Sequence, residues 1–243
     1  MRIRPVGAHA LLLDCTAPAD TPEAVADIPE TAFVEAWRAE LWRRREQGDL
    51  IAVEIVPAAR TVLLDGLPDP TATAEQLTRW TSAVTAAITR PHRTDAKAHA
   101  QDHDATAEDR AGDRADDAAD VVVPVTFDGT DLPAVAEHWG VDVPAVRHRL
   151  TRTRFRVAFC GFAPGFPYLT GLPAELALPR LPTPRPRVPA GSVALAGPYA
   201  GIYPGASPGG WLLVGRTDLV LFDVATDPPA RLGPGTTVRM VVA

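Results

Sequence analysis

The sequence predicts a two-domain protein: an N-terminal α+β domain, an acidic linker and a C-terminal β-barrel domain. Three observations lead to this prediction. Strand and helix patterns alternate over residues 1–91, an Ala/Asp-rich segment without aromatic residues covers 92–120, and short apolar runs separated by Gly and Pro fill 121–243. The length of 243 residues suits one large domain or two small ones.

The first domain begins with two short strands at 1–6 and 8–13, separated by a glycine. A helix start follows at Asp27–Glu30, where an Asp, a Pro and a Glu stand in the positions of a cap, a first-turn residue and a capping-box partner. An apolar residue then recurs every fourth position, which predicts a helix ending near Gly48: Phe33, Trp37 and Leu41.

Two strands are predicted next, at 50–56 and 60–64, and then a second helix at 73–89. One face of this helix is apolar and carries Leu77, Trp80, Val84, Ala87 and Ile88. The order strand, helix, two strands, helix predicts a small ferredoxin-like domain over 1–91, with both tryptophan-bearing helices packed on one sheet.

The acidic segment accounts for the net charge of the chain. Residues 95–120 hold nine acidic and three basic residues, and the whole chain has a formal charge of −6. Without aromatic residues or periodicity, 92–120 is expected to be a flexible linker, because it cannot bury enough surface to offset the entropy of ordering. His99 and His103 are four residues apart there, but no scaffold supports them, so we predict no metal site.

The second domain is predicted to open with a strand at 121–127 and two short helices at 131–139 and 142–151, joined at Gly140. The pair resembles a DNA-binding helix-turn-helix, because its second helix carries Arg147, His148, Arg149 and Arg152. The rest of the fold is neutral, so we predict no nucleic-acid binding and expect four residues to pack into the domain instead: Val135, Trp139, Val146 and Leu150.

From residue 155 onward the pattern is β. Strands are predicted at 155–159, 192–196, 211–214, 220–224 and 237–242. Gly and Pro separate every pair of them, and such spacing is typical of a barrel.

Composition excludes several kinds of chemistry. The only lysine is Lys97, in the acidic segment, which argues against a Schiff base, a biotinyl-lysine or a phosphate-loop lysine. Cys15 and Cys160 form no disulfide framework. No apolar run reaches the ~18 residues of a membrane span, and no signal-peptide pattern opens the sequence, so we expect a cytoplasmic protein.

Residues 159–217 are the most distinctive part of the sequence, because aromatic residues are mixed there with many Gly and Pro. This density disfavours a helix or a central strand, so we predict ordered loops that line a cleft for a substrate or a partner. Alternatively, the aromatic side chains fill the end of the barrel. The cleft candidates are Phe162, Pro164, Gly165, Phe166, Tyr168, Arg185, Arg187, Gly191, Ser192, Tyr203, Ser207, Gly209, Gly210 and Trp211.

Three arginines flank the Pro-rich turn of this stretch: Arg180, Arg185 and Arg187. The planar guanidinium group suits a carboxylate or a phosphate. The alternative is a solvated loop whose arginines contact backbone carbonyls.

A string of the serine-hydrolase type, G-x-S-x-G, occurs at residues 205–209. In that motif the residue after the serine donates its backbone N–H to the oxyanion, but here the residue is Pro208, which has no N–H. Between Cys160 and Arg216 the only acid is Glu175, so general acid–base catalysis has little to work with. We therefore assign no catalytic residue.

Three phrases, G-F-A-P-G-F at 161–166, P-A-G-S at 189–192 and S-P-G-G-W at 207–211, resemble a known family in order and spacing. It is the family of the B subunit of 5-oxoprolinase, which is also described as allophanate hydrolase subunit 1 and as the KipI-type histidine-kinase inhibitor. The resemblance is specific over residues 121–243 and looser over the first ninety.

The resemblance implies a cyclophilin-like barrel and a role in a hetero-oligomeric, ATP-dependent hydrolase that opens 5-oxo-L-proline to L-glutamate. The implied partners are the A and C subunits of 5-oxoprolinase. ATP is expected to be bound by the complex and not by this chain alone, and the chain is expected to be inactive alone.

Two alternatives stay open: a regulatory module that inhibits a sensor histidine kinase, and a carboxyltransferase-like component of an allophanate or urea pathway enzyme. Members of the family often carry a histidine shortly before the G-F-A-P-G motif. Here Leu150 stands in that position, and the nearest histidine is His148.

Overall fold

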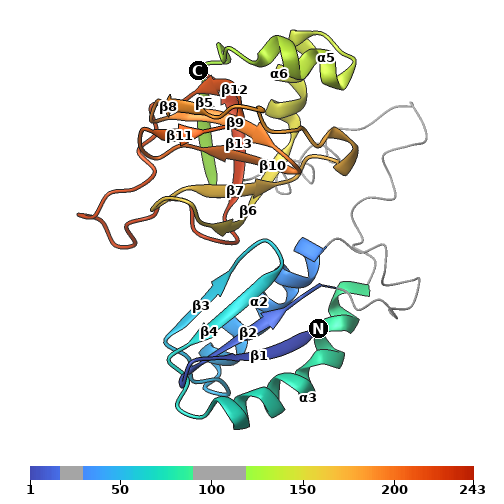
Figure 1. Cartoon of the computed structure of the whole chain (residues 1–243), viewed down its shortest axis with the longest axis vertical. Coiled ribbons are helices and arrows are strands. Elements are labelled where there is room, and N and C mark those ends of the chain that lie inside the picture. Colours follow the sequence, from blue (N-terminus) through green and yellow to red (C-terminus); the bar gives the residue numbers. More distant parts are fainter. Residues whose placement is uncertain (17–29, 90–118) are drawn as a thin grey trace, which may run out of the picture. The chain divides into compact units, whose positions relative to one another are not determined.

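The structure is a computed structural model that describes residues 1–16, 30–89 and 119–243. The chain divides into two compact units, Met1–Ala118 and Ala119–Ala243, which we call the N-terminal and C-terminal units (Figure 1). Apart from its last two residues, the expected linker 92–120 lies outside the described residues, as do His99 and His103. No helix within the described ranges is long and apolar enough to cross a membrane.

A four-stranded antiparallel sheet forms one layer of the N-terminal unit. Its strands are β1 (Arg2–Val6), β2 (Ala10–Asp14), β3 (Glu54–Pro57) and β4 (Thr61–Asp65), in the spatial order β1-β2-β4-β3. A helix connects β2 to β3, and β4 lies between these two strands, which is a split β-α-β arrangement. The hairpin strand β1 covers the remaining edge of β2.

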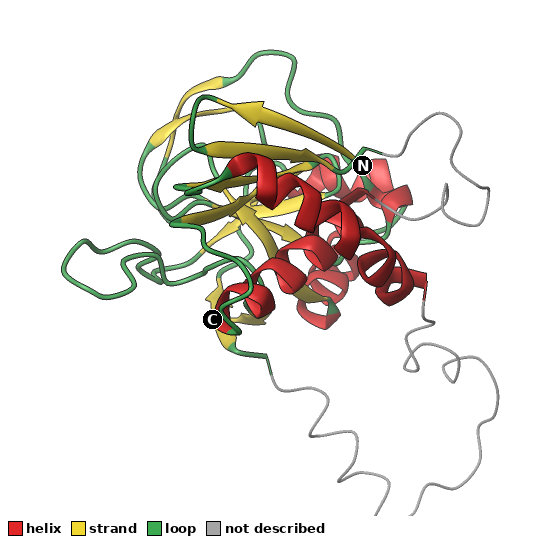
Figure 2. Cartoon of the chain, turned by 90° about the horizontal axis from the view of Figure 1, so that it is seen from below, coloured by secondary structure: helices red, strands yellow, loops and turns green. Residues whose placement is uncertain are grey.

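Two helices, α2 (Glu30–Glu46) and α3 (Pro70–Thr89), form the second layer and pack against each other and the sheet (Figure 2). The predicted apolar stripe of α2 is confirmed, because Trp37 and Leu41 are 2% and 0% exposed. Helix α3 starts three residues earlier than the periodicity predicts. The side chain of Asp69 accepts a hydrogen bond from the backbone N–H of Ala72 at 3.0 Å, so an Asp cap and a first-turn Pro set the start.

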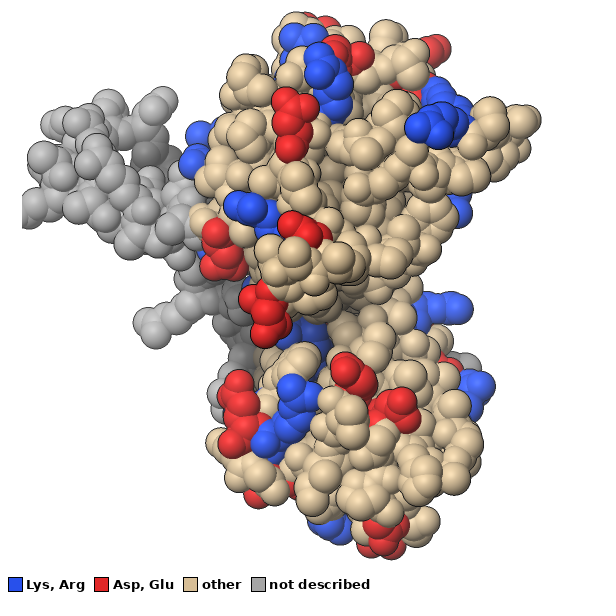
Figure 3. Space-filling view, turned by 90° about the vertical axis from the view of Figure 1, so that its left-hand side faces the viewer, with Lys and Arg blue, Asp and Glu red and all other residues tan. Residues whose placement is uncertain are grey.

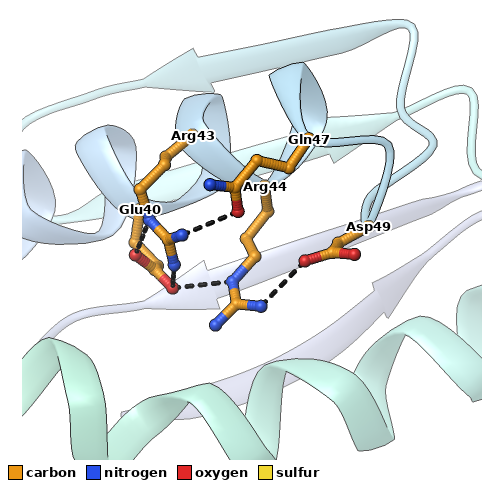
Figure 4. Close-up of polar contacts among 5 residues, drawn as sticks. All are labelled: Glu40, Arg43, Arg44, Gln47 and Asp49. Atoms are coloured by element: carbon orange, nitrogen blue, oxygen red, sulfur yellow. Dashed lines mark hydrogen bonds and ion pairs between the residues drawn. The ribbon is translucent and has the colours of Figure 1, made fainter.

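Charged side chains fasten the end of α2 to the turn that follows (Figure 4). Glu40 accepts hydrogen bonds from both Arg43 and Arg44, and Arg44 reaches Asp49 at 2.9 Å. The guanidinium of Arg44 also lies 4.7 Å from the ring centre of Trp80, on α3. Partly exposed pairs of this kind contribute little to stability, so the sheet and its apolar core hold the unit together.

The C-terminal unit is built on a seven-stranded sheet that curls into a nearly closed barrel. Its order is β12-β9-β10-β7-β6-β13-β5, and all neighbours are antiparallel except β13 and β5. Thr126, just after β5, exchanges backbone hydrogen bonds of 2.8 and 2.9 Å with Arg216 of β12 and so joins the two ends of the sheet. The strands are β5 (Val121–Val125), β6 (Arg154–Cys160), β7 (Pro167–Thr170), β9 (Ser192–Ala196), β10 (Tyr199–Ile202), β12 (Leu212–Arg216) and β13 (Thr237–Val242).

Two further strands, β8 (Arg185–Val188) and β11 (Ser207–Gly209), form a small separate sheet, and a short 3-10 helix, η1, covers Ala174–Leu176. Strands β7, β8, β10 and β11 lie where loops were predicted. The strand predicted at Val220–Val224 is wrong, because only Phe222 forms a bridge there, to Ala230. Val220 and Val224 are 64% and 84% exposed, whereas Leu221 is 1% exposed and packs in the main core of the unit.

Helices α5 (Leu132–Trp139) and α6 (Val143–Arg152) pack on the barrel. The expected packing is confirmed, because Val135, Val146 and Leu150 are 0% exposed and the indole of Trp139 donates to the carbonyl of Leu176. The basic side chains of α6 also have internal contacts: Arg147 donates to the Phe127 carbonyl, and Arg149 lies over the Trp139 ring. On the face drawn in Figure 3, acidic and basic residues of the described segments are interspersed.

Candidate functional site

Five aromatic side chains of the motif stretch meet in the C-terminal unit, and we call them the aromatic cluster: Phe162, Phe166, Tyr168, Tyr203 and Trp211. Phe166 is at the centre, with its ring 5.1–5.4 Å from each of the other four. Three of these contacts are edge-to-face, the favourable geometry for aromatic pairs. Loops and strands that are far apart in sequence therefore meet at this cluster.

Most of the cluster is interior. Phe166 and Tyr203 are 1% exposed and Trp211 is 5% exposed, whereas Phe162 is 64% exposed. Phe166, Tyr203 and Trp211 form a core cluster of their own together with Ala194 of β9, whereas the next residue, Leu195, belongs to the main core of the barrel. Successive strand residues face opposite sides of a sheet, so the aromatic side chains pack on the outer face and do not fill the end of the barrel, as the alternative interpretation expected. Phe162 is the member that presents a broad apolar surface to its surroundings.

Close backbone approach explains two of the glycines. A Cβ at Gly209 would lie 2.3 Å from the hydroxyl oxygen of Tyr203, and a Cβ at Gly165, where φ is +76°, would lie 2.7 Å from Phe222. Neither position can accept a side chain without movement. The other candidates are spread around the cluster: Pro164 is exposed in the 161–166 turn, Arg187 is exposed on β8, Gly191 and Ser192 are buried at the start of β9, and Gly210 joins β11 to β12.

Arg185 is engaged in an internal ion pair. Its guanidinium donates to Asp131 at 2.7 Å, and the second carboxylate oxygen of Asp131 accepts from the backbone N–H of Leu213, also at 2.7 Å. Asp131 stands at the start of α5 but makes no side-chain cap there. Its role was not predicted from the sequence, because 54 residues separate the partners.

Arg180 is placed differently. It is exposed and makes no hydrogen bond or ion pair to any residue that the structure describes. The backbone beside it is fixed, because the N–H of Leu181 donates to the carbonyl of Gly210 at 2.7 Å. Burial raises the pKa of Tyr168 and of Tyr203, and the positive charge of Arg180 opposes the rise in both pKa values.

Ser207 has none of the surroundings of a nucleophile. It lies in the short strand β11, paired with Val188 of β8, and not at a strand-to-helix turn. Its hydroxyl oxygen is buried and has no hydrogen-bond partner in the described parts of the chain. Leu150, at the position of the family's histidine, is 0% exposed, and His148 is exposed on α6.

The loop at 220–231 packs against the motif turn and was not recognised from the sequence. It lines a pocket of about 360 Å³, to which Phe222, Asp223 and Arg231 contribute. Phe222 is the residue that excludes a side chain from Gly165, so this loop and the 161–166 turn are packed together.

Groups that could hold a metal are not found among residues 1–16, 30–89 and 119–243, where no three His, Cys, Asp or Glu side chains come together. Cys160 donates its thiol to the Leu232 carbonyl, and burial raises its pKa to about 11, so the thiol is protonated near neutral pH.

Comparison with known proteins identifies the family. The family described as carboxyltransferase domain, subdomain C and D, matches residues 1–232. The B subunit of the 5-oxoprolinase of Escherichia coli O157:H7 is 48% identical over 124 residues, which cover 50% of this chain and 57% of that protein. The corresponding protein of Bacillus subtilis (strain 168), which carries the same name, is 42% identical over 124 residues, 50% of this chain and 52% of that protein. The chain thus spans about half the length of these curated relatives.

Solved structures show the same fold. TTHA0988 is 30% identical with a TM-score of 0.63, and the match covers 100% of this chain and 40% of that one. The urea amidolyase of K. lactis is 19% identical with a TM-score of 0.58, covering 99% of this chain and 15% of that one, and this likeness concerns the fold alone. The resemblance to the B subunit of 5-oxoprolinase is confirmed, and the chain belongs to the family of the carboxyltransferase domain, subdomain C and D.

Proposed function

We propose that this chain is the B subunit of an ATP-dependent 5-oxoprolinase complex, which opens the ring of 5-oxo-L-proline to give L-glutamate. The observation that carries the proposal is the identity of 42–48% to three curated relatives that are named as the B subunit of 5-oxoprolinase. Homologues of the A and C subunits are the proposed partners. The complex holds ATP, this chain alone is inactive, and its location is the cytoplasm.

The chemistry of the C-terminal unit supports a shared site. Around the aromatic cluster the chain offers hydroxyls and arginines, and the carboxylate of Asp131 is already paired with Arg185 at 2.7 Å. Ring opening needs a group that delivers water to the lactam carbonyl and a group that protonates the leaving nitrogen. We assign these two roles to the partner subunits.

Phe162 is the proposed contact with the C subunit. A large apolar side chain that is 64% exposed gains little from packing within its own chain. It also has a φ of +70°, a conformation that costs a non-glycine residue about 1–3 kcal/mol. An aromatic residue held there is suited to filling a pocket on a partner, so we place the interface at the rim of three loops: Phe162–Tyr168, Arg185–Ser192 and Tyr203–Trp211.

We also propose a known fold type for each of the two units. The N-terminal unit is a ferredoxin-like variant, in which β1 takes the edge position that the last strand occupies in the parent fold. The C-terminal unit is a cyclophilin-like barrel.

The test is co-expression of this chain with homologues of the A and C subunits, followed by size exclusion and an assay of 5-oxoproline-dependent ATP hydrolysis. We expect a stable hetero-complex and turnover only when all three proteins are present. Phe162→Ala is expected to weaken assembly by about tenfold or more, whereas Ile51→Ala, which truncates a residue that is 69% exposed in the N-terminal unit, leaves assembly unchanged. Elution of the chain apart from a folded C subunit, or turnover by the chain alone, contradicts the proposal.

A second candidate is a carboxyltransferase-like component of an allophanate or urea pathway enzyme, which the description of the matching family favours. The same complex separates the two candidates. ATP hydrolysis stimulated by urea or allophanate, and not by 5-oxo-L-proline, selects the second candidate.

A further inference from the structure

The long segment that connects β12 to β13 projects from the barrel (Figure 1), and its residues 220–231 surround the pocket of about 360 Å³, which we call the loop pocket. We infer that the loop pocket binds a free α-amino acid with an apolar side chain. Asp223 holds the ammonium group of this ligand and Arg231 holds its carboxylate. Binding of such a ligand is an activity beyond the function proposed above.

A short antiparallel ribbon forms the frame of the loop pocket. Phe222 forms a β-bridge with Ala230, and the residues that follow them, Asp223 and Arg231, each donate a backbone hydrogen bond of 2.9 Å across the ribbon. At the tip, the hydroxyl of Thr226 donates to the carbonyl of Asp223 at 2.9 Å. The backbone around the pocket is therefore held by its own hydrogen bonds.

The base of this ribbon is anchored in the C-terminal unit. Leu221 and Leu232 are 1% and 0% exposed and belong to the main core of the barrel. Phe222 lies against the motif turn, because a Cβ at Gly165 would be 2.7 Å from the Cβ of Phe222. The loop pocket is therefore preformed, as sites for small molecules usually are.

Two opposite charges line the loop pocket without pairing. Asp223 and Arg231 are both part of its wall, but they form no ion pair with each other or with another described residue. One carboxylate oxygen of Asp223 accepts a hydrogen bond from the backbone N–H of Ala225 at 2.9 Å, which fixes the direction of this group and leaves its second oxygen open. The pocket thus offers one oriented acceptor and one guanidinium donor to a ligand.

The ribbon sets the spacing of these two charges. Successive residues of a strand point to opposite sides, so Asp223 and Arg231, which each follow a residue of the bridge, share one side of the ribbon. They are diagonal neighbours across it, and such neighbours are about 7–8 Å apart. An α-amino acid carries its ammonium and carboxylate groups on the same carbon, so it can contact both side chains from the space between them.

The charges and the walls of the loop pocket select the class of ligand. One carboxylate and one guanidinium balance a zwitterion without net charge, whereas a simple carboxylate such as 5-oxo-L-proline brings no cation to Asp223. The volume of about 360 Å³ is near the small end of ligand pockets, which favours a ligand the size of a single amino acid. The rest of the wall is mostly apolar and suits an aliphatic side chain: Val220, Leu221, Phe222, Pro228, Pro229 and Ala230.

The experiment is isothermal titration calorimetry of the full chain with four probes. L-Leucine carries both charges and an aliphatic side chain. Isocaproate is the same skeleton without the ammonium group, isoamylamine is the same skeleton without the carboxylate, and glycine keeps both charges without the side chain.

The variants neutralise one charge at a time. Asp223→Asn keeps an oxygen that can accept from the N–H of Ala225, and Arg231→Gln keeps the backbone hydrogen bond across the ribbon. The matched controls are Asp218→Asn and Arg152→Gln, which neutralise exposed residues that do not line the loop pocket. Thermal unfolding of each variant confirms that it is folded.

We expect L-leucine to bind the wild-type chain with a dissociation constant on the order of 1 mM. Isocaproate and isoamylamine should each bind at least about tenfold more weakly, because each loses one charge-assisted contact. Glycine should bind about fivefold more weakly, because it buries no side chain. Asp223→Asn and Arg231→Gln should each weaken binding of L-leucine about fivefold or more, and the two controls should leave it unchanged.

Three results would overturn the site: no binding of L-leucine to the wild-type chain, binding of L-leucine no tighter than that of isocaproate and isoamylamine, or unchanged affinity in both pocket variants. Equal binding of glycine and L-leucine would overturn the choice of an apolar side chain. The single-charge probes act on the wild-type chain, so they still decide the question if a variant fails to fold.

Discussion

Replacement of Phe166 by alanine tests whether the aromatic cluster is a structural core. Phe166 is 1% exposed and contacts four other rings. Its ring also reaches the backbone of β10, because a Cβ at Gly201 would lie 2.9 Å from it. The strand beneath cannot easily collapse into the space left by the ring, so we expect a loss near the upper end of the usual ~3–5 kcal/mol for such truncations.

The assay is thermal and urea unfolding followed by near-ultraviolet circular dichroism, which reports the packing of the aromatic rings. For the transition of the C-terminal unit, a loss of this size corresponds to a fall in Tm of about 10–20 °C. The control is Phe162→Ala: because Phe162 is 64% exposed, this change should cost no more than about 0.5 kcal/mol.

A loss of less than about 1 kcal/mol for Phe166→Ala would refute the interpretation of the cluster as a core. The expected instability also means that Phe166 cannot serve as a clean probe of a partner interface. Phe162 can, because its truncation should leave the fold intact.

Three further changes test other contacts of the C-terminal unit. Asp131→Ala leaves an arginine unpaired and a backbone N–H of β12 without its acceptor, so urea unfolding should show a loss of about 2–4 kcal/mol. The control Asp128→Ala breaks an exposed ion pair and should cost clearly less. Equal losses for the two variants would contradict the assignment. Ser207→Ala removes a buried hydroxyl that lacks a partner among the described residues, so Tm should stay the same or rise. A fluorophosphonate should not label the wild-type serine. Stoichiometric labelling would reverse the conclusion that Ser207 is not a nucleophile. Burial raises the pKa of Tyr203 above 10.0, so the folded state binds the phenol proton more tightly than the unfolded state does. The free energy of unfolding should therefore fall as pH rises above about 10, and Tyr203→Phe should reduce that fall. The same fall with pH in the wild-type chain and in Tyr203→Phe would count against the burial of this hydroxyl.

Local signals in the sequence were sufficient for the helices. The stripe through Trp37 and Leu41 predicts a buried face, and both residues are at most 2% exposed. Asp142 predicts the start of α6, and its side chain accepts from the backbone N–H of Ala145 at 2.8 Å. These features depend on residues within a few positions of one another, so periodicity and capping rules can detect them.

Strands rich in Gly and Pro were not predictable in the same way. In β10, Gly201 is required because Phe166 and Trp211 both approach its backbone. A residue of low strand propensity therefore occupies a central strand for a reason that lies in the fold. The apolar run Val220–Val224 shows the opposite error, since strand-like residues occur there without a neighbouring strand to pair with.

The candidate site shows the same limit. The motif phrases singled out Phe162, Phe166 and Trp211 but did not determine which of them are buried: Phe166 and Trp211 are, whereas Phe162 is 64% exposed. The pairing of Arg185 with Asp131 depends on a contact between segments that are 54 residues apart. No spacing within a single segment records such contacts.

The place of β13 in the barrel has a consequence for how the C-terminal unit folds. β13 is the last strand of the unit in chain order, yet it pairs in parallel with β5, the first strand, and antiparallel with β6. During synthesis, β5 through β12 leave the ribosome before the strand that must lie between β5 and β6 exists. The facing edges of those two strands stay unpaired meanwhile, and pairing over such a long separation is slow. The nascent unit is therefore exposed to strand-edge aggregation, so chaperone binding should matter most in the interval before β13 emerges.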